Sequence, residues 1–192
     1  MLSPHGISRR RFLGATTGGV LLVVPATLGA QEGMFLRADE APRQLFPDAS
    51  DVLERRVTTS PELQQRIRAL LGRAPSLWEG TYQIFAVTRA EGHLGYVVVV
   101  EEIGKHRPIT FAVAVNADAS VQDVAVLAYR EAYGGEVRER RFLKQYARKT
   151  LADPLLPYRD VRNIAGATLS VQATGRAIKK AIAVLKATAM LP

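Results

Sequence analysis

The chain has 192 residues, of which 47% are hydrophobic, so it can bury one sizeable core but has little material for two. Its formal charge of +8 falls to about +5 once the three arginines at positions 9–11 are set aside, and the remaining basic residues alternate with acidic ones, which gives no indication of nucleic-acid binding. There is no cysteine, and the three histidines (His5, His93 and His106) lack the spacing of metal ligands, so no disulfide, iron–sulfur cluster or metal site is predicted and redox chemistry would require an organic cofactor.

The N-terminal segment is typical of an export signal. Residues 8–14 read SRRRFLG, and an apolar stretch over 15–28 precedes the small residues Gly29 and Ala30. That stretch is too short for a comfortable membrane span, which takes about 20 residues. An arginine pair followed by Phe-Leu resembles a twin-arginine signal. We therefore predict a twin-arginine signal peptide over residues 1–30 and a periplasmic location for the rest. The alternative is an uncleaved basic amphipathic anchor, which would keep the protein at the inner membrane.

Residues 31–80 are predicted to be a lead-in and a helix that pack on the main domain. The sequence LFPDAS, residues 45–50, forms a Pro-bearing turn expected to pin the chain to the body. The first clear helix has Ser60 as its cap, Pro61 at its first position and Gly72 at its end. Its apolar stripe consists of Leu63, Ile67, Leu70 and Leu71.

From Thr81 onward the sequence favours strands. The runs rich in β-branched and aromatic residues are Tyr82 to Thr88, Leu94 to Ile103, Ile109 to Val115, and Val121 to Arg130. Short turn-type separators between them favour an antiparallel meander. The continuous apolar run over 96–100 indicates a central strand covered on both faces. Helices before and after a block of strands predict an α+β fold, with an antiparallel sheet flanked by helices and a single domain over residues 81–192.

Two helical segments are predicted after the sheet. The first follows the turn at Gly134 and Gly135, with Phe142 and Leu143 buried and Arg138, Arg140, Arg141 and Lys144 outside. The last helix is expected to begin near Ser170. Its apolar stripe is Val171, Thr174, Ile178, Ala181, Ile182 and Leu185, and its basic residues largely outside the stripe are Arg176, Lys179, Lys180 and Lys186.

The segment NIAGATLS, residues 163–170, is the main candidate for chemistry. Gly166 and Ala167 keep side chains away from an approaching ligand, and Thr168 offers a hydroxyl. The helix that follows presents unpaired N–H groups and the positive end of its dipole, which together stabilise a bound phosphate. On these residues alone, a plain capped turn explains the pattern as well.

The run GATLS, residues 166–170, resembles the flavin-attachment motif Ser/Thr-Gly-Ala-Thr of FMN-binding domains. Such domains occur in the sodium-pumping NADH:quinone reductase, in the related Rnf complexes and in free-standing periplasmic proteins. The resemblance implies that Thr168 is esterified to the phosphate of FMN by a separate, magnesium-dependent flavin transferase that takes FMN from FAD. It also implies that Gly166, Ala167 and Leu169 belong to the binding loop and that Ser170 is the hydroxyl commonly found two places after the threonine.

A second stretch is similar to the same family. YREAYGGEV, residues 129–137, stands where the family has a Glu-containing, Gly-rich turn, and FLKQYARK, residues 142–149, is similar to the segment after it. The resemblance implies that the flavin ring lies towards Glu131, Tyr133 and Gly134. Tyr129 is another expected packing partner, and Glu131 is expected to bond the ring or the ribityl hydroxyls. The alternatives are a core or strand-end role for each tyrosine and a solvated acid at Glu131.

The sequence departs from the family motif at two positions. Ala165 stands where Ser or Thr usually precedes the glycine, and Arg162 stands where an Asp often opens the motif. Asp160 is the nearest acid that might take its place if the loop has a different shape. In the second stretch, Lys144 and Lys149 are candidates for stabilising the anionic reduced flavin, with solvated side chains as the alternative.

We expect an electron-transfer protein rather than an enzyme with its own substrate. Its expected partners are the flavin transferase and a membrane or periplasmic redox protein. One alternative is a small flavin-dependent reductase of an organic acceptor, although no second catalytic domain fits in the chain. Another is a non-redox binding or regulatory module whose attachment motif has decayed, for which Ala165 and Arg162 are the main support. Flavin content and turnover with soluble acceptors distinguish the three.

Overall fold

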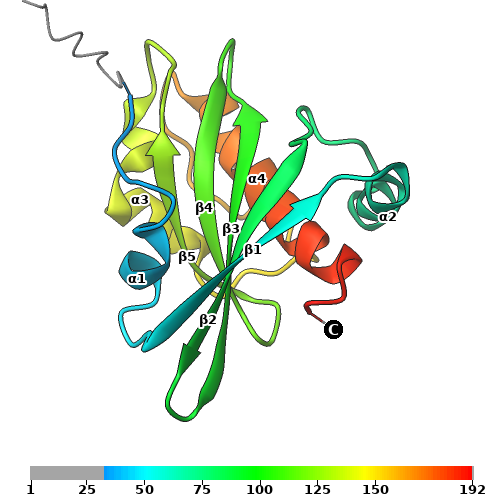
Figure 1. Cartoon of the computed structure of the whole chain (residues 1–192). Coiled ribbons are helices and arrows are strands. Elements are labelled where there is room, and N and C mark those ends of the chain that lie inside the picture. Colours follow the sequence, from blue (N-terminus) through cyan, green and yellow to red (C-terminus); the bar gives the residue numbers. More distant parts are fainter. Residues whose placement is uncertain (1–32, 192) are drawn as a thin grey trace, which may run out of the picture. The chain divides into compact units, whose positions relative to one another are not determined.

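A computed structural model describes residues 33–191, and at its centre is an antiparallel sheet of five strands (Figure 1). The strands lie in chain order and are β1 (Asp51–Thr58), β2 (Thr81–Arg89), β3 (Gly92–Ile103), β4 (Pro108–Asn116) and β5 (Val121–Ala128). Successive antiparallel strands need only short turns, which explains this meander. The four predicted strands are confirmed with small shifts at their ends. The predicted signal peptide lies outside the described residues.

Strand β1 has no counterpart in the sequence-based prediction. Most of its side chains are exposed, and Glu54, Arg55 and Arg56 place three charges in its middle. It pairs only with β2, from Asp51 opposite Thr88 onward. Charged edge strands of this kind resist pairing with other chains. They also lack the alternation of apolar residues by which strands are recognised.

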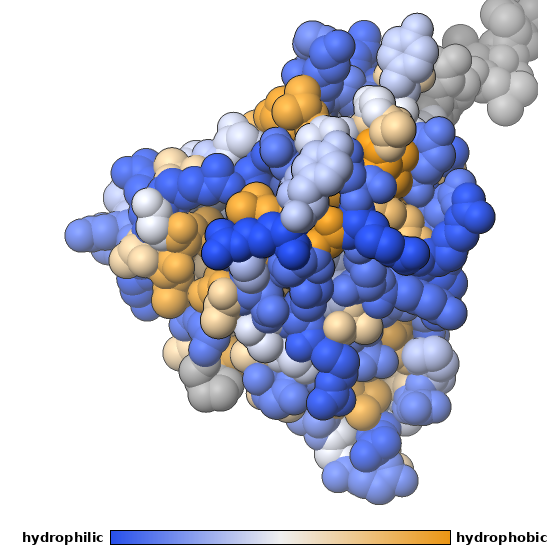
Figure 2. All heavy atoms as spheres, turned by 180° about the vertical axis from the view of Figure 1, so that it is seen from behind, coloured by the Kyte–Doolittle hydropathy of each residue, from blue (hydrophilic) through white to orange (hydrophobic). Residues whose placement is uncertain are grey.

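Helices cover both faces of the sheet. They are α1 (Ala41–Leu45), α2 (Pro61–Leu71), α3 (Arg140–Leu143) and α4 (Thr168–Ala187), with 3₁₀ turns η1 (Gly135–Arg138) and η2 (Lys144–Tyr146). The long α4 packs on one face and α1 on the other (Figure 1). From behind, the surface is mostly hydrophilic, with small separate hydrophobic patches (Figure 2). This arrangement confirms the α+β fold.

The core has two parts, one on each face of the sheet. Val98 and Val100 of β3 point into the cluster shared with α4, whereas Val97 joins the cluster of α1. The prediction of a central strand covered on both faces is thus confirmed. Leu45 and Phe46 of LFPDAS are also buried in the second cluster, as expected for a turn that pins the chain to the body.

Helix α2 begins and ends as its sequence predicts. The Ser60 hydroxyl accepts a hydrogen bond from the backbone N–H of Leu63 at 3.2 Å, and Gly72 ends the helix with a φ of 69°. The buried stripe is narrower than predicted. Leu63 and Ile67 are buried, but Leu71 is only partly buried and Leu70 is exposed.

The two C-terminal helical segments need correction. Residues 135–146 form three short helical segments, η1, α3 and η2, rather than one helix. Phe142 and Leu143 are buried and the basic residues are outside, as predicted. Helix α4 begins at Thr168, two residues before the predicted start at Ser170. Its cap residue, Ala167, makes no side-chain capping bond, so the sequence carries no cap signal at the true boundary.

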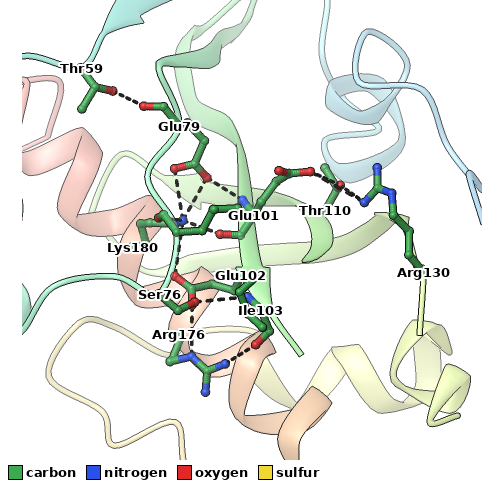
Figure 3. Close-up of polar contacts among 11 residues, drawn as sticks. Thr59, Ser76, Glu79, Glu101, Glu102, Ile103, Thr110, Arg130, Arg176 and Lys180 are labelled. Carbon is green, nitrogen blue, oxygen red and sulfur yellow. Dashed lines mark hydrogen bonds and ion pairs between the residues drawn. The ribbon is translucent and has the colours of Figure 1, made fainter. Parts of the chain in front are cut away.

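The prediction that Lys180 lies largely outside the apolar stripe of the last helix is wrong, because Lys180 is fully buried on α4. Its Nζ lies 3.0 Å from Glu79 Oε1 and 3.4 Å from Glu102 Oε1, and it donates to the carbonyl oxygens of Leu77 and Glu101 (Figure 3). The segment before β2 and the end of β3 together supply the polar partners that a buried ammonium requires.

Within residues 33–191, no helix is long and apolar enough to cross a membrane. The same residues contain no group of three or more side chains suited to holding a metal ion.

Candidate cofactor site

Three segments meet at one end of the sheet: the turn between β3 and β4, the turn after β5, and the start of α4 (Figure 1). Between them lies a pocket of about 440 Å³. Its lining residues are Lys105, His106, Glu131, Ala132, Tyr133, Gly166, Ala167, Thr168, Leu169 and Ser170. The fold therefore brings together the two sequence stretches predicted to form the site, whose lining residues, 131–133 and 166–170, lie more than thirty positions apart. Gly134 and Tyr129, which were also predicted to lie at the flavin, are outside this lining.

Thr168 occupies the first position of α4 and is half-buried. Its Oγ1 accepts a hydrogen bond from Asn163 Nδ2 at 2.9 Å. The first backbone bond of the helix runs from Val171 N to Ala167 O at 3.0 Å, so the amides of the three preceding residues come before the helical ladder. The positive end of a 20-residue helix thus lies at the Thr168 hydroxyl. A phosphate joined to that oxygen would be stabilised by these N–H groups.

Ser170 has a different position from Thr168. Its side chain is buried, and its Oγ lies 3.0 Å from the hydroxyl of Tyr129. The same Tyr129 hydroxyl donates to the carbonyl oxygen of Tyr133 at 2.5 Å. Burial raises the pKa of Tyr129, so this phenol stays protonated and can donate. Ser170 and Tyr129 therefore tie α4 to the turn after β5, which gives Tyr129 the core role left open by the sequence.

The turn after β5 and the loop before α4 pack against each other through their smallest residues. Gly134 has a φ of 83°, and a Cβ on it would lie 2.8 Å from the Cβ of Ala167 and 2.9 Å from the Tyr129 hydroxyl. Glycine is therefore required at 134 both for conformation and for space. Gly166 has a φ of 77° but open space around it, so glycine there serves the backbone conformation. The methyl group of Ala167 is buried, in contact range of Gly134.

Glu131 holds the turn between β3 and β4. Its Oε1 accepts hydrogen bonds from the backbone N–H groups of Lys105, His106 and Arg107 at 2.6, 2.6 and 2.9 Å. Partial burial raises the pKa of Glu131, but the three donors together outweigh it and leave this pKa below its usual value. The structure thus gives Glu131 a role within the protein that sequence reasoning did not foresee.

Lys105 and His106 are pocket residues that sequence reasoning missed. Both are exposed, and both reach the pocket because the Glu131 carboxylate fixes their turn. The nearest signal in the sequence is the run of three basic residues, Lys105, His106 and Arg107, between Gly104 and Pro108, and such runs are common in surface turns. Cations at this place favour a negatively charged ligand group.

Replacement of Glu131 by Ala should loosen this turn. We expect amide hydrogen exchange at residues 105–107 to accelerate about tenfold, because three N–H groups lose a charged acceptor. Since the folded-state pKa of Glu131 is lowered, its contribution is complete above the ordinary carboxyl pKa and is lost as the pH falls through the lowered value. The wild type should therefore show the same loosening in acid. Equal exchange rates in wild type and Glu131→Ala would contradict this, and Glu136→Ala is the control.

Other predicted ligand groups are occupied elsewhere or lie away from the pocket. Lys149 pairs with Asp160 at 3.0 Å, and Asp160 also accepts the backbone N–H groups of Leu155 and Leu156. Asp160 therefore braces its own loop and does not stand in for the acid missing at position 162. Neither Lys144 nor Lys149 lines the pocket.

The pocket has the features that FMN would need. The start of α4, with Lys105 and His106, offers donors and positive charge for the phosphate. Tyr133 and Leu169 are 85% and 45% exposed, which leaves aromatic and apolar surface for a planar ring. Asn163 Oδ1, close to Thr168, is buried and has no hydrogen-bond partner. An open acceptor beside the attachment point is suited to a hydroxyl or N–H group of a bound molecule.

Comparison with known proteins agrees with this geometry. Residues 104–183 match the model of the FMN-binding domain family. The match spans the turn after β3, all of β4 and β5, every residue that lines the pocket, and most of α4. No curated protein matches the chain. Over residues 104–183 the chain is therefore similar to the FMN-binding domain family, which supports a flavoprotein.

Proposed function

We propose that this protein is an exported electron carrier that holds FMN through a phosphoester bond to Thr168. The observation that carries the proposal is the position of the Thr168 hydroxyl, at the N-terminus of α4 and in the lining of the pocket. A helix N-terminus stabilises the negative charge that remains on a phosphodiester. The two sequence departures, Ala165 and Arg162, do not remove any of these features.

Attachment requires only a hydroxyl and an activated flavin. Thr168 Oγ1 would form a bond to the flavin phosphorus of FAD, the pyrophosphate bond would break, AMP would leave, and the hydroxyl proton would pass to a base of the transferase. No oxidant or reductant is consumed. The bound FMN would then supply one- and two-electron redox chemistry. The role of the protein is to hold it, orient it and leave part of it accessible.

An electron-carrier role is supported by the open mouth of the pocket. Tyr133 and Leu169 are exposed there, so a ring packed against them would keep an edge accessible to a partner. We expect chemically reduced protein to pass electrons rapidly to a small cytochrome or dye, with negligible turnover of organic substrates. Stopped-flow mixing and a substrate screen measure the two properties. A substrate-specific rate in the ordinary enzyme range, roughly 1 to 1000 per second, would favour a reductase instead.

The export part of the proposal rests on residues 1–30, with their arginine pair and apolar stretch. A covalent bond suits a carrier in that location, because a lost cofactor cannot easily be replaced outside the cytoplasm. Its partner there would be a membrane or periplasmic redox protein. Fractionation of cells that produce the full chain tests the location, and a product found only in the cytoplasm would contradict it.

A further inference from the structure

Asn163 is the polar side chain that contacts the Thr168 hydroxyl. Its Nδ2 lies 2.9 Å from Thr168 Oγ1 and 2.5 Å from the hydroxyl of Tyr158, and donates to both. The family motif on which the resemblance rests places no requirement on this position. The contact is therefore seen in the structure of this chain and could not be predicted from the motif.

Two sets of contacts hold the loop just before Asn163. Before it, Asp160 accepts two backbone N–H groups and pairs with Lys149. Immediately before Asn163, the backbone N–H of Arg162 donates to Gln145 Oε1 at 2.7 Å. These bonds fix the backbone at Asn163 before any flavin arrives, so its amide is already directed at the Thr168 hydroxyl.

The other end of the same amide has no partner. Asn163 Oδ1 is buried within the described structure and makes no hydrogen bond. A buried acceptor without a donor is unfavourable and is found at few positions in native proteins. Asn163 itself does not line the pocket, but the amide group to which this oxygen belongs donates to the hydroxyl of Thr168, which does.

We propose that Asn163 is the positioning residue for flavin attachment, an inference that rests on the proposed function. Its Nδ2 donates to Thr168 Oγ1 and holds that oxygen towards the pocket. Because Oγ1 accepts this bond, its own proton stays free to pass to the base of the transferase when the bond to phosphorus forms and AMP leaves. The same N–H stabilises the negative charge that develops on Oγ1.

The test is a labelling assay with purified full chain, flavin transferase, FAD and Mg²⁺. The variants are Asn163→Leu, which removes the amide, and Asn163→Asp, which keeps the shape but cannot donate. We expect both to lower kcat for flavin transfer by about 10- to 100-fold. The KM for the protein acceptor should stay the same, because the amide acts on the reacting oxygen. Arg159→Ala, which alters another exposed residue of the same loop outside the motif, should leave kcat unchanged.

The outcomes separate this inference from the proposed function. If the wild type takes up no flavin, the proposed function itself fails. If the wild type is labelled and Asn163→Asp matches its kcat, the positioning role is overturned while covalent attachment stands. Melting curves of both variants show whether each one folds. If Asn163→Leu does not fold, the kcat of Asn163→Asp alone tests the positioning role.

Discussion

Replacing Lys180 by methionine is expected to lower the free energy of unfolding by about 3–5 kcal/mol, because it removes one partner from a buried ionic network. The Lys180 ammonium is fully buried beside Glu79 and Glu102 (Figure 3). Arg176 pairs with the other oxygen of Glu102 at 3.1 Å, so two acids and two cations balance in the wild type. Without Lys180, the largely buried carboxylate of Glu79 loses the cation that pairs with it among the described residues. Urea unfolding measures the change.

Lys179 offers a matched control for this substitution. It is adjacent in sequence and only half-buried, and no ion pair involves it among the described residues. Lys179→Met should therefore change the free energy of unfolding by less than about 0.5 kcal/mol. A second substitution, Glu79→Gln, should recover part of the loss caused by Lys180→Met, because it removes the stranded charge. Equal stabilities of Lys179→Met and Lys180→Met would contradict the account of the network.

Replacing Thr168 by valine is expected to abolish covalent flavin while the fold persists. Valine keeps the shape of threonine but has no hydroxyl to bond to phosphorus. Flavin fluorescence on a denaturing gel and melting curves measure the two properties. Helix α4 should remain intact, since Thr168 takes no part in a capping bond.

Ser170→Ala distinguishes between the two hydroxyls at the start of α4. The Ser170 hydroxyl is buried and bonded to Tyr129. We expect this variant to keep the flavin label, with a modest loss of stability of about 1 kcal/mol from the lost hydrogen bond. Label retained in Thr168→Val, or lost in Ser170→Ala alone, would mean that the attachment residue is assigned wrongly.

The features predicted correctly from the sequence are those with local causes. Helix α2 was predictable because Ser60, Pro61 and Gly72 each act within a few residues. Strands β2 to β5 were predictable because their apolar runs are bounded by turn residues. The two stretches that resemble the family meet at one pocket, as the resemblance implied, and FMN binding there stays a prediction.

The features missed depend on contacts between distant segments. In the sequence, Lys180 has the spacing of a solvated helix residue. In the structure it is covered by the segment with Leu77 and Glu79, which contacts its ammonium group. Lys105 enters the site only because Glu131, 26 residues later, binds its turn. Asn163 shows its contact with Thr168 only once the loop is closed. Edge strand β1 is stabilised by pairing with β2 rather than by a buried face. Its sequence therefore lacks the alternation of apolar residues that predicts a strand.

The most direct test of covalent attachment is the intact mass of the full-length product purified from a host that possesses the flavin transferase. The processed chain should be heavier than its polypeptide by one FMN less one water. Peptide fragmentation should place that addition on Thr168. A purified chain with the mass of the bare polypeptide, from cells in which the transferase labels another acceptor, would contradict the central claim.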